Sequence, residues 1–308
     1  MKEALLKASG VLLLTLLWEI GPRLHWVDAQ FLPPFSEVIM TLGHLLMEGN
    51  LLTHTLVSLW RALTGLLLAA VFAVPLGFVI GGWFPQSIPY LNPLFRIWSQ
   101  VNPFSLLPVF ILFFGIGEQA KLVVVAWICF WPLFYNTITG VQNLDSVLVK
   151  TAHSMGVSPY QLFSKVLLPG AMPQIFTGFR LGAELAFFML IAAEMVGAHA
   201  GLGWMLHNAA MLNLVPRIYA SGLLIVLLGV FVHQVLLTLE RGLLTWQDNY
   251  QPVDTGVAVV APPRGRQQLY LLAVSLIVLW GVGAWQVDCV NTHGLKHQEP
   301  SHNMMNME

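Results

Sequence analysis

Charged residues are scarce in this chain. Asp, Glu, Lys and Arg make up 9% of its 308 residues, far below the share of roughly a quarter that soluble domains carry. The formal net charge is only −1, which argues against a nucleic-acid partner. Hydrophobic residues make up 56% of the sequence. This balance predicts one polytopic membrane domain rather than two soluble globular ones.

Sequence patterns for metal binding and catalysis are also missing. The two cysteines, Cys129 and Cys289, lie far apart in the sequence and suggest neither a disulfide framework nor a metal knuckle. No glycine is followed by lysine, so the chain lacks the phosphate-binding loop G-x-x-x-x-G-K-[ST]. No Ser/His/Asp or Cys/His constellation stands out on a loop. We therefore expect a chain that is not an enzyme, holds no cofactor and does not itself hydrolyse ATP.

Apolar segments recur along the chain and predict seven membrane spans. The first apolar run, 11–18, follows two lysines as in a signal peptide. No small-x-small cleavage site follows it closely, so a retained span is favoured. The remaining predicted spans are 51–83, 85–115, 122–139, 175–196, 218–239 and 269–287. Residues 21–50 read as an external segment with a short helix near 36–47.

The segment 150–169 carries helix signals without a membrane-spanning pattern. Asp145 and Ser146 can cap a first short helix, and Gly156 can end it, because glycine takes a left-handed conformation without strain. Ser158 can cap a second helix that starts at Pro159 and has Gln161 three residues after the cap. Pro169 and Gly170 are expected to end this second helix. The pattern predicts a helix–Gly–helix segment with an apolar side, placed outside the membrane.

This segment resembles the EAA loop of the inner-membrane subunits of binding-protein-dependent ABC importers. In that family, a glycine precedes Ile-x-Leu-Pro by nine residues, and here Gly156 precedes 166–169, read as VLLP, by nine. Ala152 matches the second alanine of the motif, whereas Lys150 and Thr151 replace its Glu and Ala. The flanking text, SLWRALTG at 58–65, PVFILFFGIGE at 108–118 and AAEMVGAHAGLG after the loop, resembles the sulfonate, nitrate and taurine branch.

The resemblance implies an all-α polytopic membrane protein with a six-helix type I ABC importer permease core and an extra C-terminal transmembrane helix. It implies two ATPase subunits holding ATP and Mg²⁺, a second copy of this permease, an external binding protein and surrounding membrane lipid. The substrate class is then a small oxyanion or organic solute such as a sulfonate, taurine, nitrate or bicarbonate. The residues expected to couple to the ATPase are Lys150, Ala152, Gly156, Leu162, Phe163, Val166, Leu168 and Pro169.

The predicted domain division follows from these segments. Residues 1–50 hold the first span and the external segment, and 51–247 form the permease domain with its cytoplasmic loop at 141–174. Residues 248–268 are a polar, Pro-containing linker. The extra span, 269–287, is followed by the tail, 288–308.

Polar residues at membrane depth must find partners or face a watery cavity. Either interhelical hydrogen bonding or a translocation path accounts for those in the predicted spans, and both stay open. Pro93, Pro103 and Pro108 are expected to break the third span, with polar residues between the breaks. The candidate path residues are Gln100, Asn102, Ser105, Asn136 and Glu194.

The predicted spans contain ionisable residues, among them Arg61, Glu184 and Glu194. Arg61 is expected to snorkel to the interface or to pair with a helix end, rather than to take part in transport. Glu184 and Glu194 can act as proton or cation sites. They can equally pair with Arg180, one turn from Glu184, or cap a neighbouring helix, and this structural interpretation is favoured.

Two other classes of protein remain as alternatives. An ATP-independent secondary transporter or channel would use Glu184 and Glu194 as coupling groups, although no paired interrupted spans suggest inverted repeats. A membrane anchor or sensor would use its tail to bind a soft metal such as Cu(I), although a disordered tail is the simpler interpretation. The tail candidates are His293, His297, His302 and Met304.

Span parity and charge predict the orientation. With a cytoplasmic amino terminus, four spans before the loop place Lys150 and Lys165 in the cytoplasm. More Lys and Arg residues then lie inside than outside, as the positive-inside rule requires. The seventh span carries the tail to the external side of a bacterial-type inner membrane.

Overall fold

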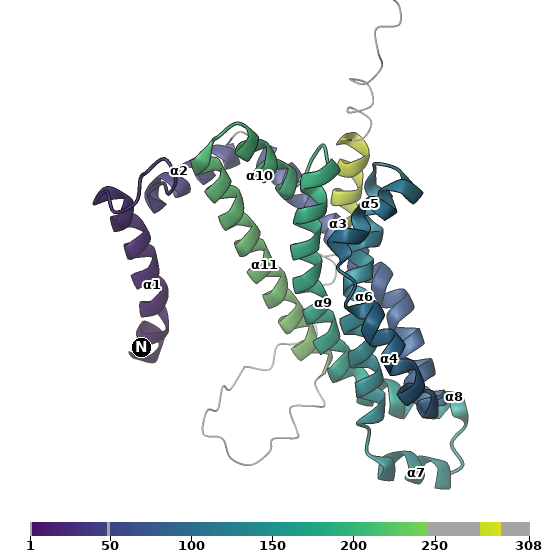
Figure 1. Cartoon of the computed structure of the whole chain (residues 1–308). Coiled ribbons are helices and arrows are strands. Elements are labelled where there is room, and N and C mark those ends of the chain that lie inside the picture. Colours follow the sequence, from purple (N-terminus) through teal and green to yellow (C-terminus); the bar gives the residue numbers. More distant parts are fainter. Residues whose placement is uncertain (1, 48–49, 245–277, 291–308) are drawn as a thin grey trace, which may run out of the picture.

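The computed structural model describes residues 2–47, 50–244 and 278–290, and within these the chain is helical with no strand. Residues 278–290 form one further, unlabelled helix. The labelled elements in Figure 1 are α1 (Lys2–Arg23), α2 (Phe35–Met47), α3 (Asn50–Phe78), the π-helix η1 (Val79–Trp83), the 3-10 helix η2 (Pro85–Ser87), α4 (Ile88–Ser99), α5 (Pro103–Phe114), α6 (Glu118–Gln142), α7 (Ser146–Ser154), α8 (Pro159–Leu162), the π-helix η3 (Phe163–Leu167), α9 (Leu168–Gly197), α10 (Leu202–Met211) and α11 (Val215–Leu243).

Four described helices are long and apolar enough to cross a membrane, namely 51–83, 118–142, 159–197 and 215–243. The pair α4 and α5 counts as a fifth if it is one span, bent by 82°. The all-α polytopic fold is confirmed. The predicted count of six spans plus one stays a prediction, because α1 is not in this group and only part of 269–287 is described.

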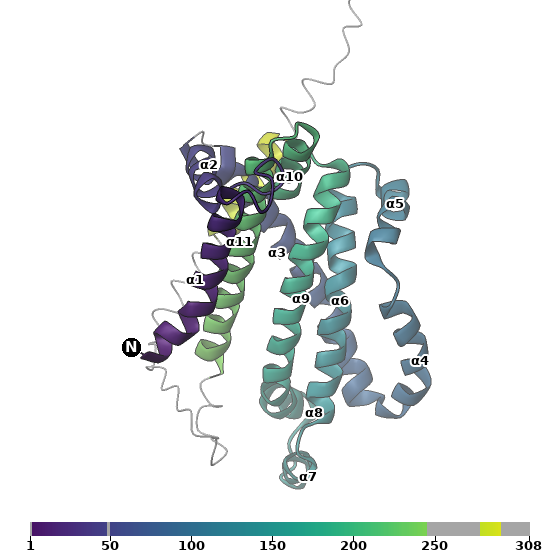
Figure 2. The same cartoon turned by 60° about the vertical axis from the view of Figure 1, so that its left-hand side comes forward.

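The core of the bundle is the packing of α3, α6 and α9 (Figure 2). Small residues allow these helices to approach closely: Gly65 and Gly77 of α3 face α6, and Gly178 and Gly182 of α9 face α6 as well. The buried cluster between them includes Leu66, Val125, Cys129, Leu133 and Phe134 of α3 and α6, together with Ala183, Ala186 and Leu190 of α9. These contacts fix the long helices side by side.

Helix α1 stands apart from this core and reaches the rest of the chain near its carboxyl end (Figure 1). Trp18 contacts Phe35 of α2 and Tyr219 of α11, with ring centroids 5.4 and 5.7 Å apart. The carboxylate of Glu19 accepts hydrogen bonds from the backbone N–H and the hydroxyl of Ser36. Helix α2 is the short helix expected near 36–47.

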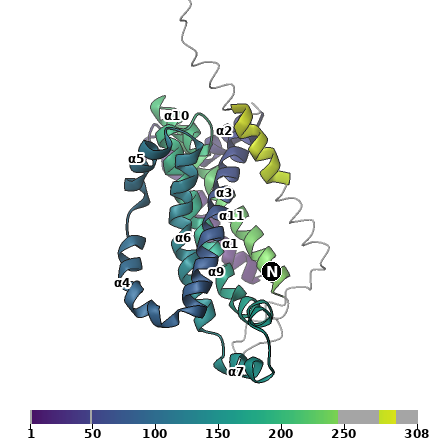
Figure 3. The same cartoon turned by 90° about the vertical axis from the view of Figure 1, so that its right-hand side faces the viewer.

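The helix 278–290 packs on the outer part of α3 (Figure 3). The indole N–H of Trp280 donates a 3.1 Å hydrogen bond to Thr64. Val287 lies in a buried cluster with Val57 and Ala200. This helix overlaps the predicted seventh span, whereas the predicted linker and the tail candidates His293, His297, His302 and Met304 lie outside the described residues.

Two expectations about helix boundaries were wrong in part. The expected break at Pro103 is present, since the third span bends at 100–102 between α4 and α5, but Pro93 and Pro108 lie inside those helices and do not break them. Neighbouring groups can satisfy the backbone that such prolines free, so a proline alone does not end a membrane helix. The fourth span, predicted to begin at 122, starts earlier, because α6 already begins at Glu118.

Candidate functional site

The loop segment (145–169) lies at one end of the molecule, with α7 at the tip (Figure 1). Asp145 caps α7, since its carboxylate accepts a 2.8 Å hydrogen bond from the backbone N–H of Val147. Apart from Ala152, which is 8% exposed, the helix is largely uncovered. The first of the two predicted helices is therefore present, with its predicted cap.

Gly156 ends α7 with φ at +69°, in the left-handed region. The N–H of Val157 donates to the carbonyl of Ala152, and the N–H of Gly156 donates to that of His153. These two bonds form a Schellman motif, which satisfies carbonyls that the helix end leaves open. Nothing lies within 4 Å of a Cβ built at Gly156. Backbone strain, not crowding, is therefore what favours glycine here.

The second predicted helix starts as expected. Ser158 and Gln161 form a reciprocal capping box, with Pro159 in the first turn of α8. Its predicted end at Pro169 was wrong, because α8, η3 and α9 form one continuous helix over 159–197. The π-turn η3 precedes Pro169, and the N–H of Leu168 bonds to the carbonyl of Phe163 five residues back. This local shift in hydrogen bonding lets the helix continue through a residue that has no N–H.

The predicted coupling residues divide into two groups. Lys150 and Gly156 are exposed, whereas Ala152 is buried and Leu162, Phe163, Val166, Leu168 and Pro169 are half-buried. The ring of Phe163 packs edge-on against Phe78 of α3, with centroids 5.2 Å apart. Phe163 and Leu168 also contact a buried cluster formed by Phe78, Val141, Ala171 and Ile175. Phe163 and Leu168 thus hold η3 and the start of α9 to the transmembrane bundle.

Other apolar side chains project away from the bundle. Leu148 of α7 and Met155, which directly follows it, are 58% and 76% exposed, and Val147 and Tyr160 are 62% and 78% exposed. We call these four exposed residues of the loop segment the tip surface. Exposed large apolar side chains that recur within one short segment indicate an interaction site. The tip surface is therefore the part of the loop segment available to a partner protein.

A cluster of charged residues lies at the other end of α3, α6 and α9. The guanidinium of Arg61, 2% exposed, makes two bonds of 2.6 and 2.7 Å to Glu118 and one of 2.7 Å to Glu194. Its Nη1 also donates a 2.6 Å hydrogen bond to the carbonyl of Ala200. Lys121 adds a second cation, 3.2 Å from Glu118. Two cations thus balance two carboxylates in the ion-pair cluster (Arg61, Glu118, Lys121 and Glu194).

Glu194 is fully buried and saturated with hydrogen bonds. Its oxygens accept 2.8 Å bonds from the hydroxyl of Ser58 and a 2.9 Å bond from the N–H of Gly203, in the first turn of α10. Ser58 in turn accepts a bond from the N–H of Leu202. The expectation that a carboxylate in this span caps a neighbouring helix is confirmed for Glu194. The cluster fixes α10 and the segment after α9 onto α3.

Of the two expectations about charge pairs, one was met in its second form and the other was wrong. Arg61 does not snorkel to an interface; it pairs with helix ends, namely Glu118 in the first turn of α6 and Glu194 in the last turn of α9, whose attractive charges offset its loss of solvation. Arg180 and Glu184 do not pair with each other across one helical turn. Both find partners on α11 instead, Arg180 with Glu240 at 3.1 Å and Glu184 with His233 at 3.2 Å. Helix packing places these partners closer than the helical neighbour.

The structure does not bring the five path candidates together. Gln100, Asn102 and Ser105 are exposed at the bend between α4 and α5. Asn136 lies on α6 against Gly178 of α9 and donates a hydrogen bond to the carbonyl of Pro132. Glu194 belongs to the ion-pair cluster. A role of Asn136 and Glu194 in the translocation path therefore stays a prediction, and their placement does not favour it.

Sequence reasoning missed the ion-pair cluster as a unit. A signal was available, because an arginine inside an apolar run needs an anion, and a chain with 15 Asp and Glu residues offers few inside its helices. Arg61, Glu118 and Glu194 each lie in one of the three flanking segments that resemble the sulfonate, nitrate and taurine branch. What the sequence did not reveal was that these motifs meet in space.

The loop segment, the helical bundle and the comparisons with known proteins together define the class. The family of binding-protein-dependent transport system inner membrane components matches residues 65–245, and the chain belongs to this family. It is therefore a multi-pass inner-membrane permease subunit of an ATP-driven ABC importer, and the family implies a separate ATPase and a binding protein as partners. The family assignment supports this function over a secondary transporter or a membrane anchor.

Three relatives show the branch. The taurine transport system permease protein of Escherichia coli is 31% identical over 244 residues, covering 78% of this chain and 88% of the relative. The putative aliphatic sulfonates transport permease protein of Bacillus subtilis is 30% identical over 235 residues, covering 76% and 85%. The bicarbonate transport system permease protein of a Synechocystis strain is 28% identical over 245 residues, covering 76% and 84%. The chain thus falls in the predicted sulfonate, taurine and nitrate branch.

Proposed function

We propose that this permease works as a homodimer with two ATPase subunits, which bind ATP and Mg²⁺, and with one external binding protein. The observation that carries this proposal is the tip surface. Burying one large apolar side chain is worth about 1.5–3 kcal/mol, so the exposed Leu148, Met155 and Tyr160 favour docking onto another protein. We propose no catalytic role and no cofactor for the permease chain itself.

The solute that we propose is a small oxyanion or an organic solute that carries one. The relatives are named for aliphatic sulfonates, taurine and bicarbonate. These solutes share a compact group of negatively charged oxygens. Gln100, Asn102 and Ser105 are proposed to line the translocation path, because exposed polar groups at a break in a membrane helix require water or a polar partner.

The proposed orientation puts the loop segment in the cytoplasm with the ATPase. The ion-pair cluster then lies at the external end of the bundle. Val287 packs beside Val57 and Ala200 at that same end, which supports an external position for the residues after 290. The amino terminus is proposed to be cytoplasmic, as the positive-inside rule predicts.

Reconstitution tests this function directly. The permease is co-expressed with a candidate ATPase and binding protein and incorporated into proteoliposomes, and uptake of labelled taurine, an alkanesulfonate, nitrate and bicarbonate is measured. We expect uptake that requires ATP, Mg²⁺ and the binding protein together. Uptake that proceeds without ATP and follows an ion gradient would contradict the proposal.

A further inference from the structure

The helix 278–290 runs antiparallel to the first turns of α3 (Figure 3). The matching positions, in order along α3, are Val57 with Val287, Trp60 with Gly283 and Thr64 with Trp280. On both helices these residues are spaced three or four apart, so each helix presents a single face to the other. The helix 278–290 is therefore fitted to this part of α3 over two turns.

Gly283 allows the two backbones to approach closely. A Cβ built at Gly283 would lie 2.7 Å from the Cβ of Trp60 and 3.1 Å from the carbonyl oxygen of Leu56. That oxygen belongs to the backbone of α3, so a larger side chain at position 283 has to push the two helices apart. Among the described residues, nothing lies within 4 Å of a Cβ built at Gly281. The close contact thus depends on one of two glycines in the same helix.

The same turns of α3 hold the α9–α10 turn (198–203) through polar side chains. Three successive N–H groups of this turn, at 201–203, donate in order to His54, Ser58 and Glu194, at 3.1, 2.8 and 2.9 Å. The first N–H groups of a helix have no partner inside that helix. The start of α10 therefore depends on the side chains of α3 and α9 for its hydrogen bonds.

Ala200 connects the α9–α10 turn to the helix 278–290. Its carbonyl accepts the 2.6 Å hydrogen bond from Arg61, and the residue lies in a buried cluster with Val57 and Val287. The turn is thus held by polar groups of α3 and also by an apolar contact with the helix 278–290. If this helix moves away, the apolar cluster opens and only the polar bonds remain.

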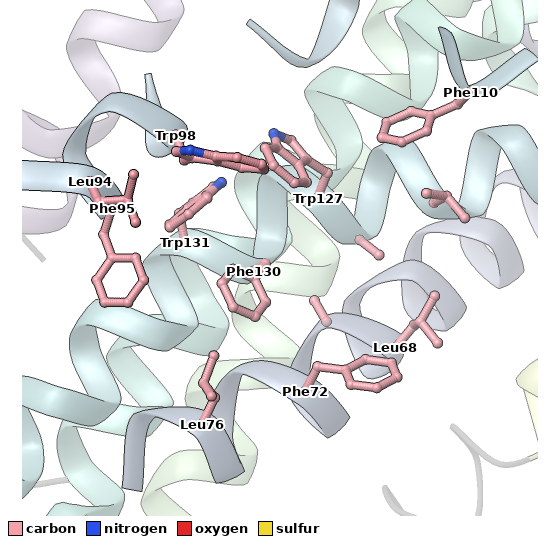
Figure 4. A pocket seen from close by; sticks show the side chains of 13 residues that line it. Leu68, Phe72, Leu76, Leu94, Phe95, Trp98, Phe110, Trp127, Phe130 and Trp131 are labelled. Carbon is pink, nitrogen blue, oxygen red and sulfur yellow. The ribbon is translucent and has the colours of Figure 1, made fainter. Parts of the chain in front are cut away.

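Further along α3, the packing is looser. Leu68, Phe72 and Leu76 line an apolar cavity of about 600 Å³, which α3 shares with α4, α5 and α6 (Figure 4). Side chains beside a void lack contacts on that side, so this part of α3 is held less firmly than a fully packed helix. The contacts at 57–64 therefore matter for keeping the first turns of α3 in place.

We propose that the helix 278–290 is a clamp, which holds the α9–α10 turn against α3 and keeps this end of the bundle closed. In the proposed orientation this end is external, and an importer has to open it to admit the solute. The clamp then sets how readily the external end opens. This inference rests on the proposed function for the direction of transport, and it goes beyond that function by giving a regulatory role to this helix.

Hydrogen exchange of the full chain in lipid nanodiscs, followed by mass spectrometry, tests the clamp. Gly283→Leu pushes the helix off α3, and exchange of the amides 201–203 is expected to become about tenfold faster or more, because the turn loses an apolar contact. Gly281→Leu is the matched control and should exchange as the unchanged protein does. Val287→Ala, a milder change, should speed the same exchange by a smaller factor. Peptides from α6 should exchange equally in all these proteins.

Two results of this measurement would overturn the proposal. Equal exchange at 201–203 in Gly283→Leu, Val287→Ala and Gly281→Leu would show that the helix does not hold the turn. Faster exchange throughout α6 as well would show that the helix is a general support of the fold. The measurement needs neither ATPase nor binding protein, so a failure of ATP-driven uptake contradicts the proposed function alone.

ATP hydrolysis by the assembled transporter tests the regulatory role. Without binding protein, hydrolysis is expected to be severalfold faster with Gly283→Leu than with Gly281→Leu, because coupling between the two ends of the bundle is reciprocal. Unchanged hydrolysis together with faster exchange at 201–203 would reduce the helix to a local support and overturn its role in opening.

Discussion

At the scale of single residues, Arg61 is the side chain on which the end of the bundle opposite the loop segment depends. It contacts Glu118 of α6, Glu194 of α9 and the carbonyl of Ala200 at once. Removing it leaves two carboxylates in a buried site with one remaining cation, Lys121. Removing one partner of a buried ion pair is far more damaging than removing an exposed one.

Arg61→Met is therefore expected to lower the free energy of unfolding by about 3–5 kcal/mol. Thermal or denaturant unfolding in detergent micelles measures the change. Arg23→Met is the control, because Arg23 pairs with Glu19 with 63% of its side chain exposed, and the expected loss there is about 0–1 kcal/mol. Equal effects of the two changes would contradict the role given to the cluster.

Gly156 gives a second prediction at this scale. Gly156→Val must hold a β-branched residue at positive φ, at a cost of roughly 1–2 kcal/mol, and the relaxed turn should misplace α7. Recovery of the ATPase by pull-down of the permease is expected to fall about tenfold. Gly156→Asn is the matched control, since asparagine tolerates the left-handed region, and it should keep most of the recovery. Full recovery with Gly156→Val would show that this turn does not position the docking surface.

Single residues also show where sequence reasoning succeeded. The caps at Asp145 and Ser158 and the turn at Gly156 were predictable, because each depends on groups within a few residues along the chain. The pairing of Arg61 with Glu118 and Glu194 was not, because it joins positions 57 and 133 residues apart. The partners of Arg180 and Glu184 were unpredictable for the same reason. Both partners lie on α11, far along the chain, and not on the same helix as expected.

At the scale of elements, α7 and α8 differ in what they contact. Helix α7 carries most of the exposed tip surface, whereas η3 and the start of α9 pack into the cluster around Phe78. Phe163 is expected to support the loop segment through its contact with Phe78, and the coupling role predicted for Leu162 and Phe163 stays a prediction. The sequence showed an apolar side on both helices, but not which side the bundle itself covers.

A charge introduced on the tip surface is expected to weaken docking of the ATPase without affecting the folding of the permease. Met155→Glu or Leu148→Glu places a carboxylate in an apolar contact, and the affinity for the ATPase should fall at least about tenfold with no change in thermal stability. Ser154→Glu, on the polar face beside Lys150, is the control. Undiminished ATPase binding in both variants would exclude the tip surface as the docking site.

Phe163→Ala is expected to lower the stability of the permease, in contrast to the changes on the tip surface. The half-buried ring contacts Phe78, so the loss of stability is expected to be roughly 2 kcal/mol, below the 3–5 kcal/mol of a fully buried phenylalanine. Unfolding of the purified permease measures it, and Tyr160→Ala, 78% exposed, is the comparison with little expected change. A stability unaffected by Phe163→Ala would mean that α8 is held by other contacts.

At the scale of the whole molecule, the loop segment and the ion-pair cluster mark opposite ends of the bundle, and their sides of the membrane can be tested. In a Cys289→Ser background, Ser154→Cys and Asn208→Cys each add one exposed thiol, while Cys129 stays buried. An impermeant maleimide added to spheroplasts should label Asn208→Cys at once and Ser154→Cys only after permeabilisation. The reverse pattern would invert the proposed orientation.

The helix that runs unbroken over 39 residues, 159–197, joins these two ends. At 1.5 Å per residue it is about 58 Å long, with the loop segment at one end and Glu194 near the other. Such a rod acts as a lever: a tilt of about 5° about one end displaces the other end by about 5 Å. A displacement of that size exceeds the length of every bond that Arg61 makes. If a nucleotide-binding partner docks at the loop segment as proposed, a small rotation there is enough to break contacts at the other end of this helix.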